Sequence, residues 1–265
     1  MESVIKKEIQ RFSEQKFTSL FDNIIVEEPL EIFINQKISP YLVTMRTPGD
    51  DMNLSLGLLY SLGIIAKASD VESYKVINDH QLIIYLIHTN IPEAKIHSSF
   101  SSCGICNSQS WEEVNFHSIF PVFDKAIRFS SNTIHQSHIK LTESDDYFSL
   151  TGGNHKVALW SEKENKIFVA EDVGRHNALD KVIGKCISGN LLPLKNYIAI
   201  LSGRCSFEMC QKTWLAGIPI IVSRGAPTSK AIELADNAGI TLIGFARSES
   251  FNVYTHPYRI ENERK

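Results

Sequence analysis

Two cysteines three positions apart, Cys103 and Cys106, are the residues of this chain whose types and spacing most directly suggest chemistry. A cysteine acts as a nucleophile, a metal ligand or a sulfur acceptor in its thiolate form. Pairs at this spacing serve redox exchange, form half of a zinc site, or carry sulfur. Gly104 and the serines before Cys103 are small, so we predict that the pair lies on a mobile loop.

Two of these uses find little support in the rest of the chain. A zinc site needs further ligands, but the sequence has no second Cys-x-x-Cys pair and no Cys₂His₂ spacing. A thioredoxin-type redox pair follows a strand directly and opens a helix. Here the preceding expected strand ends well before Cys103, and no clear helix follows the pair. The surrounding residues therefore argue against zinc and against a thioredoxin-like centre.

The densest polar run of the chain, Glu171 to Lys181, lies where an expected strand ends and a helix begins. In open α/β sheets, ligands bind outside the carboxyl ends of strands, and helix N-termini there present free N–H groups to anions. Arg175 is suited to clamp a phosphate and His176 to hydrogen-bond or transfer a proton, with Glu171 or Asp172 orienting either one. The alternative is a solvated helix cap with internal ion pairs.

Two further turns repeat this order of apolar strand, small-residue turn with an arginine, and helix. They are Ser202-Gly203-Arg204-Cys205-Ser206 and Arg224-Gly225-Ala226-Pro227-Thr228. Three strand ends that carry glycine and arginine together predict a basic pocket for a phosphorylated or nucleotide-bearing ligand. For any single arginine the alternative is a surface ion pair. Gly152 and Gly153 before His155 form a weaker pattern, which a plain turn also explains.

Composition restricts the classes of protein that the chain can belong to. The 265 residues are 43% hydrophobic and 22% charged, which is typical of globular domains, and the net charge of -3 does not suggest a nucleic-acid partner. Five cysteines do not suggest a secreted disulfide framework, and Cys186, Cys205 and Cys210 are expected to be buried and structural. The first residues lack a signal-peptide pattern, and the longest near-apolar run, Leu54 to Ala66, is shorter than the roughly 18 residues of a membrane span. We therefore expect a cytoplasmic, reduced protein with no membrane partner.

The elements that position these residues follow from hydrophobic periodicity. Beyond about residue 130, strands alternate with short helices, which favours an α/β sheet with helices on its faces. The region before residue 100 is predicted to be β-rich with one prominent helix, and residues 1 to about 20 to be a loose arm. Strands are expected at 24–26, 30–34, 41–45, 71–76, 82–87, 157–160, 167–170, 197–201, 218–222, 240–245 and 251–254, and helices from the turn at 47–51 to about 62 and at 130–142, 177–187, 207–216 and 228–237.

Taken together, these motifs resemble those of the FdhD family. The motifs that carry the resemblance are Cys103-Gly104-Ile105-Cys106, Gly152-Gly153-x-His155, the run from Glu171 to Lys181, Ser202-Gly203-Arg204-x-Ser206-x-Glu208, Ala226-Pro227-Thr228 and Gly244-Phe245-Ala246-Arg247 up to Val253-Tyr254-Thr255. They lie in family order, and the β-rich N-terminal region also fits. Each motif alone is weak, but the set is highly specific.

The resemblance implies a sulfur carrier that is needed to make active formate dehydrogenase. In this family a cysteine desulfurase hands sulfur to the first cysteine of the pair, which maps to Cys103, with Cys106 as its helper. The carrier passes the sulfur, as a persulfide, to the molybdenum or tungsten of bis-(molybdopterin guanine dinucleotide). A GDP- or GMP-like nucleotide is expected to mimic this substrate, and no zinc or other resident metal is expected. Family members form homodimers, so a homodimer is implied.

The resemblance also implies the fold and part of the site. It predicts a three-layer α/β domain like that of cytidine deaminases at 128–265, a smaller β-rich N-terminal domain with one helix at 1–100, and the mobile loop and linker at 101–127. The family's cofactor-binding segment maps onto residues 245–250. With the strand-end residues above, the expected cofactor-binding residues are Gly152, Gly153, His155, Arg175, His176, Ser202, Gly203, Arg204, Phe245, Ala246, Arg247, Ser248, Glu249 and Ser250.

Two other functions remain to be weighed. A deaminase-like fold suggests a second possible function, that of a zinc deaminase, whose chemistry needs the motifs His-x-Glu and Pro-Cys-x-x-Cys. No histidine of this chain is followed two residues later by glutamate, and no proline precedes Cys103. A non-catalytic chaperone that only binds the nucleotide end of the cofactor would leave Cys103 dispensable.

Overall fold

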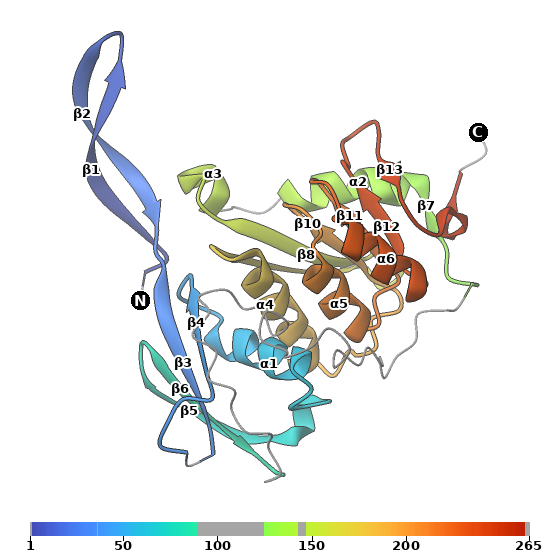
Figure 1. Cartoon of the computed structure of the whole chain (residues 1–265), viewed down its shortest axis with the longest axis horizontal. Helices are drawn as coiled ribbons and strands as arrows, with labels where there is room; N and C mark the ends of the chain where they lie inside the picture. Colours follow the sequence, from blue (N-terminus) through green and yellow to red (C-terminus); the bar gives the residue numbers. More distant parts are fainter. Residues whose placement is uncertain (1, 36, 89–124, 143–146, 263–265) are drawn as a thin grey trace.

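A computed structural model describes residues 2–35, 37–88, 125–142 and 147–262 of the chain (Figure 1). Most of the predicted Cys-x-x-Cys loop at 101–127, including Cys103 and Cys106, lies outside the described residues. Each of the helices within these ranges is too short or too polar to cross a membrane.

The larger part of the protein is built on a six-stranded sheet with the order β13-β12-β11-β10-β8-β9. Its strands β10, β11 and β12 run parallel, whereas β8 is antiparallel to both of its neighbours and β13 is antiparallel to β12. The strands are β8 (His155–Ser161), β9 (Lys166–Asp172), β10 (Ile198–Leu201), β11 (Ile220–Ser223), β12 (Thr241–Gly244) and β13 (Asn252–Val253). β10 to β12 are buried along their whole length, as expected for strands covered on both faces.

Helices cover both faces of this sheet, so the larger part has three layers. Alternate residues of β8 separate the two faces: Val157 and Leu159 join the core under α4 (Arg175–Ser188), α5 (Phe207–Leu215) and α6 (Ser229–Asn237), whereas Ala158 and Trp160 join the cluster under α2 (Ser131–Thr142). Figure 1 shows α2 and α4 on opposite sides of the sheet. The predicted mixed α/β class with a three-layer larger part is confirmed, and the more specific likeness to cytidine deaminases stays a prediction.

The smaller N-terminal part is a four-stranded sheet that carries one long helix. Its strand order is β4-β3-β6-β5, with β3 and β6 parallel and the other pairs antiparallel. The alternating burial of β3 and β6 packs one face of the sheet against α1. The elements are β3 (Glu28–Ile34), β4 (Leu42–Arg46), α1 (Asp51–Ser61), the 3₁₀ turn η1 (Ala68–Asp70), β5 (Val71–Asn78) and β6 (Gln81–Leu86).

The two parts meet where α1 crosses α4, and glycines let these helices touch. A Cβ on Gly57 of α1 would lie 2.6 Å from the carbonyl carbon of Asp180, and a Cβ on Gly184 of α4 would lie 2.6 Å from that of Asn53. One hydrophobic core cluster runs through both parts, from Leu30 and Leu54 to Leu179 and Leu242. The proposed boundaries at 100 and 127 stay a prediction, but the core itself crosses them.

The prediction of a loose arm at residues 1 to about 20 is wrong. The strands β1 (Val4–Ser13) and β2 (Lys16–Ile25) pair along their whole length as an antiparallel hairpin that projects from the body of the protein (Figure 1). The turn between them places Glu14 and Gln15 at φ values of 52° and 60°. The hydrophobic alternation is weak because most of both faces is exposed, so no buried face imposes a pattern on the sequence.

The C-terminal segment closes the fold around a buried arginine. After η3 (Pro257–Arg259), β14 (Ile260–Glu261) pairs in parallel with β7 (Phe129–Ser130). Arg259 is fully buried and donates hydrogen bonds to the Gly239 carbonyl at 2.7 Å and to Thr241 Oγ1 at 3.2 Å. The expected helices beyond residue 128 are present with shifted ends, and the five-residue helix α3 (Tyr147–Thr151) was not predicted.

Candidate functional site

The sheet topology brings the predicted site residues to one edge. β10, β11 and β12 all end at this edge, β9 ends there as well because β8 is antiparallel to both β9 and β10, and β8 begins there. We call it the strand-end edge. It carries His155 at the start of β8, Arg175 after β9, the turn 202–204 after β10, Arg224 after β11 and the segment 245–250 after β12.

The turns at the strand-end edge are tied to each other by backbone hydrogen bonds. The Gly225 N–H donates to the Gly203 carbonyl at 3.1 Å, and the Phe245 N–H donates to the Gly225 carbonyl at 3.2 Å. Ser223 Oγ donates to the Gly203 carbonyl at 2.6 Å. These three turns therefore form one connected surface across β10, β11 and β12.

Small residues in these turns allow close approach of their neighbours. A Cβ on Gly203 would lie 3.3 Å from Cε1 and Nδ1 of His155, and a Cβ on Gly225 would lie 2.9 Å from the Arg204 Cα. Ser202 Oγ accepts a hydrogen bond from the Lys156 N–H at 3.0 Å. The expected residues Ser202 and Gly203 therefore pack directly against the start of β8.

Arg175 is the first residue of α4, and its guanidinium lies at the strand-end edge with an unsatisfied donor. Its Nε is buried and has no hydrogen-bond partner. The N-cap residue of α4 is Gly174, which has no side chain to cap the helix, so the N-terminus of α4 lies at the strand-end edge without a cap from this residue. A buried donor without a partner is costly, and an anionic ligand would satisfy it.

His176 lies beside Arg175 and is held by α5. Its Nε2 is 3.0 Å from Glu208 Oε2 and 3.3 Å from Ser206 Oγ. Burial lowers the pKa of His176 to about 3, helped by the positive charge of Arg175. Burial also raises the pKa of Glu208. His176 is therefore a neutral imidazole near pH 7 and can orient a ligand without adding charge.

His155 completes the group of nitrogen-bearing side chains. Its pKa is lowered by burial and by the Arg175 charge, while the carboxylate of Asp172 acts in the opposite direction. The structure thus brings together His155, Arg175 and His176 from two elements, as the sequence predicted. Arg175 carries the positive charge in this trio.

The polar run from Glu171 to Lys181 divides into two groups with different roles. Asp172 is fully buried, and its carboxylate accepts hydrogen bonds from the N–H groups of Thr47 and Gly174 and pairs with Lys181 Nζ at 2.8 Å. These contacts join β4 to α4. Asp172 therefore supports the joint between the two parts of the protein, in place of the predicted role of orienting Arg175 or His176.

Further members of the same run also hold the fold together. Asp180 is fully buried and accepts two hydrogen bonds of 2.8 Å from Lys212 Nζ. The carboxylate of Glu171 accepts hydrogen bonds from Asn154 Nδ2 at 2.7 Å and from the Tyr147 N–H at 2.8 Å. The alternative of internal ion pairs therefore applies to much of this run. Arg175 differs because its Nε has no partner, and His176 contacts Glu208 as a neutral imidazole.

The segment 245–250 has mixed exposure. Phe245 has a φ of 52° and is 45% exposed, whereas Ala246 is buried in the core cluster under α2. Arg247 Nη1 donates to the Arg224 carbonyl at 2.8 Å, which links this segment to the neighbouring turn. Ser248, Glu249 and Ser250 are exposed. The Ala246 side chain packs in the core, so a ligand bound at the surface of this segment would contact the other five residues of 245–250.

The glycine pair before β8 lies at the end of α3 and packs against strand β2 of the hairpin. Gly152 has a φ of 65°, and its N–H donates to the Phe148 carbonyl at 2.7 Å at the end of α3. A Cβ on Gly153 would lie 2.8 Å from Ile25 Cγ2 of β2. The turn and its contact with β2 are enough to account for glycine at both positions. Ligand binding by either glycine stays a prediction.

The three cysteines of the described chain are poorly suited to react. Cys186, Cys205 and Cys210 are buried, as expected. Burial raises the pKa of Cys186 and of Cys205 to about 12 and the pKa of Cys210 well above its usual value. Their thiolates are therefore scarce near pH 7. The described residues contain no group of three or more His, Cys, Asp or Glu side chains arranged to hold a metal ion.

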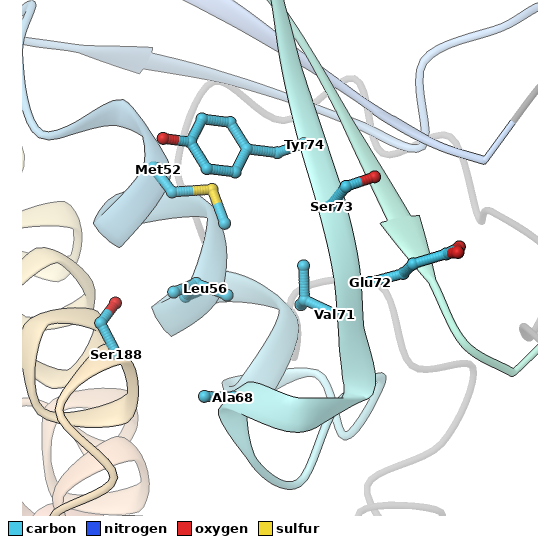
Figure 2. A pocket seen from close by; sticks show the side chains of 8 residues that line it. All are labelled: Met52, Leu56, Ala68, Val71, Glu72, Ser73, Tyr74 and Ser188. Carbon is cyan, nitrogen blue, oxygen red and sulfur yellow. The ribbon is translucent and has the colours of Figure 1, made fainter.

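A pocket of about 390 Å³ lies elsewhere, between β5 and α1 (Figure 2). It is lined by Met52 and Leu56 of α1, Val71 and Tyr74 of β5, and Ser188 at the end of α4. Because Arg175 begins α4, the pocket lies at the opposite end of that helix, about 20 Å from the strand-end edge at 1.5 Å per residue. It is therefore separate from the candidate site.

Fold and site together define an α/β protein with an anion-suited cluster at the ends of its central strands. The FdhD/NarQ family model matches residues 25–261. The chain is 40% identical over 256 residues to the sulfur carrier protein FdhD of Sulfolobus acidocaldarius, covering 97% of this chain and 98% of that protein. It is 41% identical over 243 residues to the protein of the same name from Saccharolobus solfataricus, covering 90% and 91% of the two chains.

A solved structure agrees with these matches. It is that of a Desulfotalea psychrophila protein described as a formate dehydrogenase accessory protein, with a TM-score of 0.79 and 25% identity, covering 98% of this chain and 100% of that chain. The chain belongs to the FdhD/NarQ family.

Proposed function

We propose that this protein is a sulfur carrier that receives sulfur from a cysteine desulfurase as a persulfide on Cys103. It then passes that sulfur to the bis-(molybdopterin guanine dinucleotide) cofactor of a formate dehydrogenase. Family membership and the names of the curated relatives support the sulfur-carrier role. The observation on which the cofactor-binding part rests is the strand-end edge, where the Nε of Arg175 is buried without a partner.

The cysteine chemistry supports Cys103 and Cys106 as the reactive pair. The chain has five cysteines, and three of them are buried thiols with raised pKa values. The Cys103 thiolate attacks the outer sulfur of a persulfide on the donor enzyme, the donor's S–S bond breaks, and the donor's thiolate leaves. The S–S bond of the Cys103 persulfide then breaks, Cys103 leaves as its thiolate, and the terminal sulfur is delivered to the metal of the cofactor substrate as a sulfido ligand. The two electrons that reduce this sulfur to sulfide come from that metal, or from two small thiols that form a disulfide.

The strand-end edge is suited to the guanine dinucleotide end of this substrate. Arg175 supplies a fixed positive charge and a buried Nε without a partner, and the N-terminal end of α4 adds a partial positive charge that favours phosphate oxygens. The neutral His176 and His155 offer hydrogen bonds without further charge. GDP or GMP is therefore the simplest probe of the site. The protein needs no resident metal in this scheme.

The first experiment measures the mass of the protein after sulfur loading. Incubation with a cysteine desulfurase and cysteine is expected to add about 32 Da, one sulfur, to the peptide that contains Cys103. The Cys103→Ala variant is expected to lack this mass and to fail to mature formate dehydrogenase in cells, while still folding and binding GDP. Normal maturation by Cys103→Ala would favour the non-catalytic chaperone. Added mass only on Cys186, Cys205 or Cys210 would contradict the assignment of the reactive cysteine.

The second experiment tests the strand-end edge by GDP binding. Arg175→Ala is expected to weaken binding about 10- to 100-fold, because a hydrogen bond to a charged group contributes about 1.5–3 kcal/mol. Arg204 is exposed, so Arg204→Ala is expected to weaken binding by only a few-fold. Lys166→Ala is the matched control, because it removes one positive charge at the opposite end of β9. Equal affinity of all three variants and the unchanged protein would rule out the strand-end edge as the nucleotide site.

The remaining parts of the proposal concern partners and location. We expect a homodimer that works in the cytoplasm with a desulfurase and a formate dehydrogenase as its protein partners. The Desulfotalea psychrophila protein of similar fold is itself described as a formate dehydrogenase accessory protein, which supports the second partner.

A further inference from the structure

The hairpin of β1 and β2 leaves an unusual surface without a partner in the described part of the chain. It is a separate two-stranded sheet that projects from the body of the protein (Figure 1). Two-stranded hairpins are marginally stable in water, and a third strand or a covering surface is normally needed. Phe12, Phe17 and Phe21 are nevertheless 61%, 70% and 71% exposed. Three exposed aromatic side chains on one small sheet indicate a surface that another molecule covers.

The backbone groups that face outward from β2 follow from its pairing with β1. In an antiparallel pair, hydrogen-bonded and non-hydrogen-bonded residue pairs alternate. The Val26 N–H donates to the Ser3 carbonyl at 2.9 Å, which continues the β1–β2 register and fixes this alternation. Even-numbered residues of β2 therefore bond to β1. The N–H and C=O groups of Phe17, Ser19 and Phe21 point to the outer edge of β2.

The outer edge of β2 is complementary to a second copy of itself. When two β2 strands run antiparallel with Ser19 opposite Ser19, Phe17 of each copy lies opposite Phe21 of the other. Lys16 of each copy then lies opposite Asp22 of the other. In this register each residue whose N–H and C=O groups point outward lies opposite another outward-pointing residue. The two strands can therefore form a continuous ladder of backbone hydrogen bonds. Aromatic and opposite-charge pairs are the cross-strand pairs that stabilise sheets.

Neighbouring residues within each hairpin strengthen this arrangement. Phe12 lies opposite Phe17 in the hairpin, with ring centroids 5.0 Å apart, so each aromatic row across the joined sheet would contain three phenylalanines. Lys7 lies opposite Asp22 within the hairpin. In the joined sheet each Asp22 would therefore lie between Lys7 of its own copy and Lys16 of the second copy.

The side-chain pairs and the accessible length of β2 together select this register over its neighbours. The base of the strand, Asn23 to Ile25, is partly buried and α3 contacts β2, which leaves residues 16–22 as the accessible stretch. Pairing about Ser19 uses these residues and no others. Centres at Thr18 and Leu20 also keep the backbone ladder, but they place Phe17 opposite Ser19 or Asn23 and lose the Lys16–Asp22 pair. A shift of the centre to Phe21 would need the covered base, and a shift to Phe17 would place Ser19 opposite the turn residue Gln15.

We propose that two copies of this chain pair through the outer edges of their β2 strands, antiparallel about Ser19, to form one four-stranded sheet. The occupant of the exposed surface is thus a second copy of the same hairpin. A contact of this kind is isologous and closes with two-fold symmetry. The proposal assigns a surface to the homodimer, and sulfur uptake by Cys103 does not depend on it.

A proline at the centre of the edge tests the proposal directly. Ser19→Pro removes an N–H that does not bond to β1, so the hairpin ladder stays intact, while the central bonds between copies are lost. Sedimentation of the full chain over a range of concentrations is expected to show a dimer for the unchanged protein and for the control Ser19→Thr. Ser19→Pro is expected to dissociate at least tenfold more readily. A monomer at every concentration for the unchanged protein, or equal dimerisation by Ser19→Pro, would overturn the proposal.

A charge-exchange experiment tests the register without proline. Lys16→Asp places a second carboxylate opposite Asp22 of the other copy, and Asp22→Lys places two lysines opposite each other, so each variant alone is expected to dimerise at least tenfold more weakly. A mixture of the two variants restores opposite charges at both positions and is expected to form mixed dimers. Mixed dimers no more frequent than dimers of either variant alone would contradict the Ser19-centred register. Added persulfide mass on the monomeric Ser19→Pro protein separates this result from any failure of the sulfur-carrier proposal.

Discussion

The crossing of α1 and α4 gives a sharp test of how the two parts of the protein are joined. In Gly184→Ala, the new Cβ would lie 2.6 Å from the Asn53 carbonyl carbon, where ordinary contact begins at 3.4 Å, and would overlap the carbonyl oxygen. The obstacle is backbone, so no side-chain rotation relieves it. The helices must separate by more than about 0.8 Å, because that is the shortfall at the carbonyl carbon and the carbonyl oxygen lies closer still.

Two opposing effects determine the expected change in stability. Alanine is favoured over glycine inside a helix by about 0.8–1 kcal/mol. Overpacking of a core costs about 1–3 kcal/mol and occasionally more, and backbone clashes lie at the upper end. We expect a net loss of about 2 kcal/mol, which for a chain of this size lowers the melting temperature by about 4–8 °C.

The assay is urea unfolding followed by far-ultraviolet circular dichroism, with Gly189→Ala as the control. Gly189 ends the same helix, and a Cβ there would lie 3.3 Å from the Leu191 side chain and, at an ordinary contact distance of 3.5 Å, from the Lys185 carbonyl oxygen. Gly57→Ala should resemble Gly184→Ala, and the double variant should lose less than the sum of both, because one separation of the helices relieves both clashes. A Gly184→Ala protein as stable as the unchanged chain would refute the close packing of these helices.

Three further expectations concern charge and backbone conformation. Burial lowers the pKa of His176 from 6.5 to about 3. Between these two pH values the unfolded chain binds a proton at this histidine and the folded chain does not, so the free energy of unfolding decreases as the pH falls below about 6.5. Between pH 7 and pH 5 the unchanged protein should lose about 2 kcal/mol more than His176→Gln in urea unfolding, and an equal loss in both would contradict this. Asp180→Asn leaves the buried Lys212 without a carboxylate and should cost about 3–5 kcal/mol, whereas Asp180→Leu combined with Lys212→Met should recover most of the stability. Gln15→Gly relieves a φ of 60° by about 1 kcal/mol and should slow amide exchange in the hairpin about fivefold; unchanged exchange would show that the turn is unstrained.

The central sheet could be predicted from the sequence because its strands are buried on both faces. Runs such as Ile198 to Leu201 and Ile220 to Val222 are continuously apolar, and short helices with one apolar face follow them. The hairpin could not be predicted in the same way, since its strands bury little and carry no alternating pattern. The helix α3 has only five residues, too few for a helical period to show.

The candidate site was predictable in its location but not in its division of roles. Strand ends with glycine and arginine pointed to one edge, and the topology brings them there. The sequence could not show that Asp172 bonds to Thr47, more than a hundred residues earlier in the chain. Nor could it show that His176 meets Glu208, since that contact depends on the packing of α4 against α5. Long-range pairings of this kind follow from the fold and not from local pattern.

The shared core across α1 and α4 has a consequence for how the chain can be divided. The core cluster draws residues from both before His88 and after Lys125, and the Asp172–Thr47 and Lys181–Thr47 hydrogen bonds reinforce the same joint. The two pieces therefore recognise each other through contacts that need no covalent link. Produced as separate fragments, residues 1–88 and 125–265 should reassemble into one particle. The chain therefore contains two segments that are expected to complement each other as separate fragments.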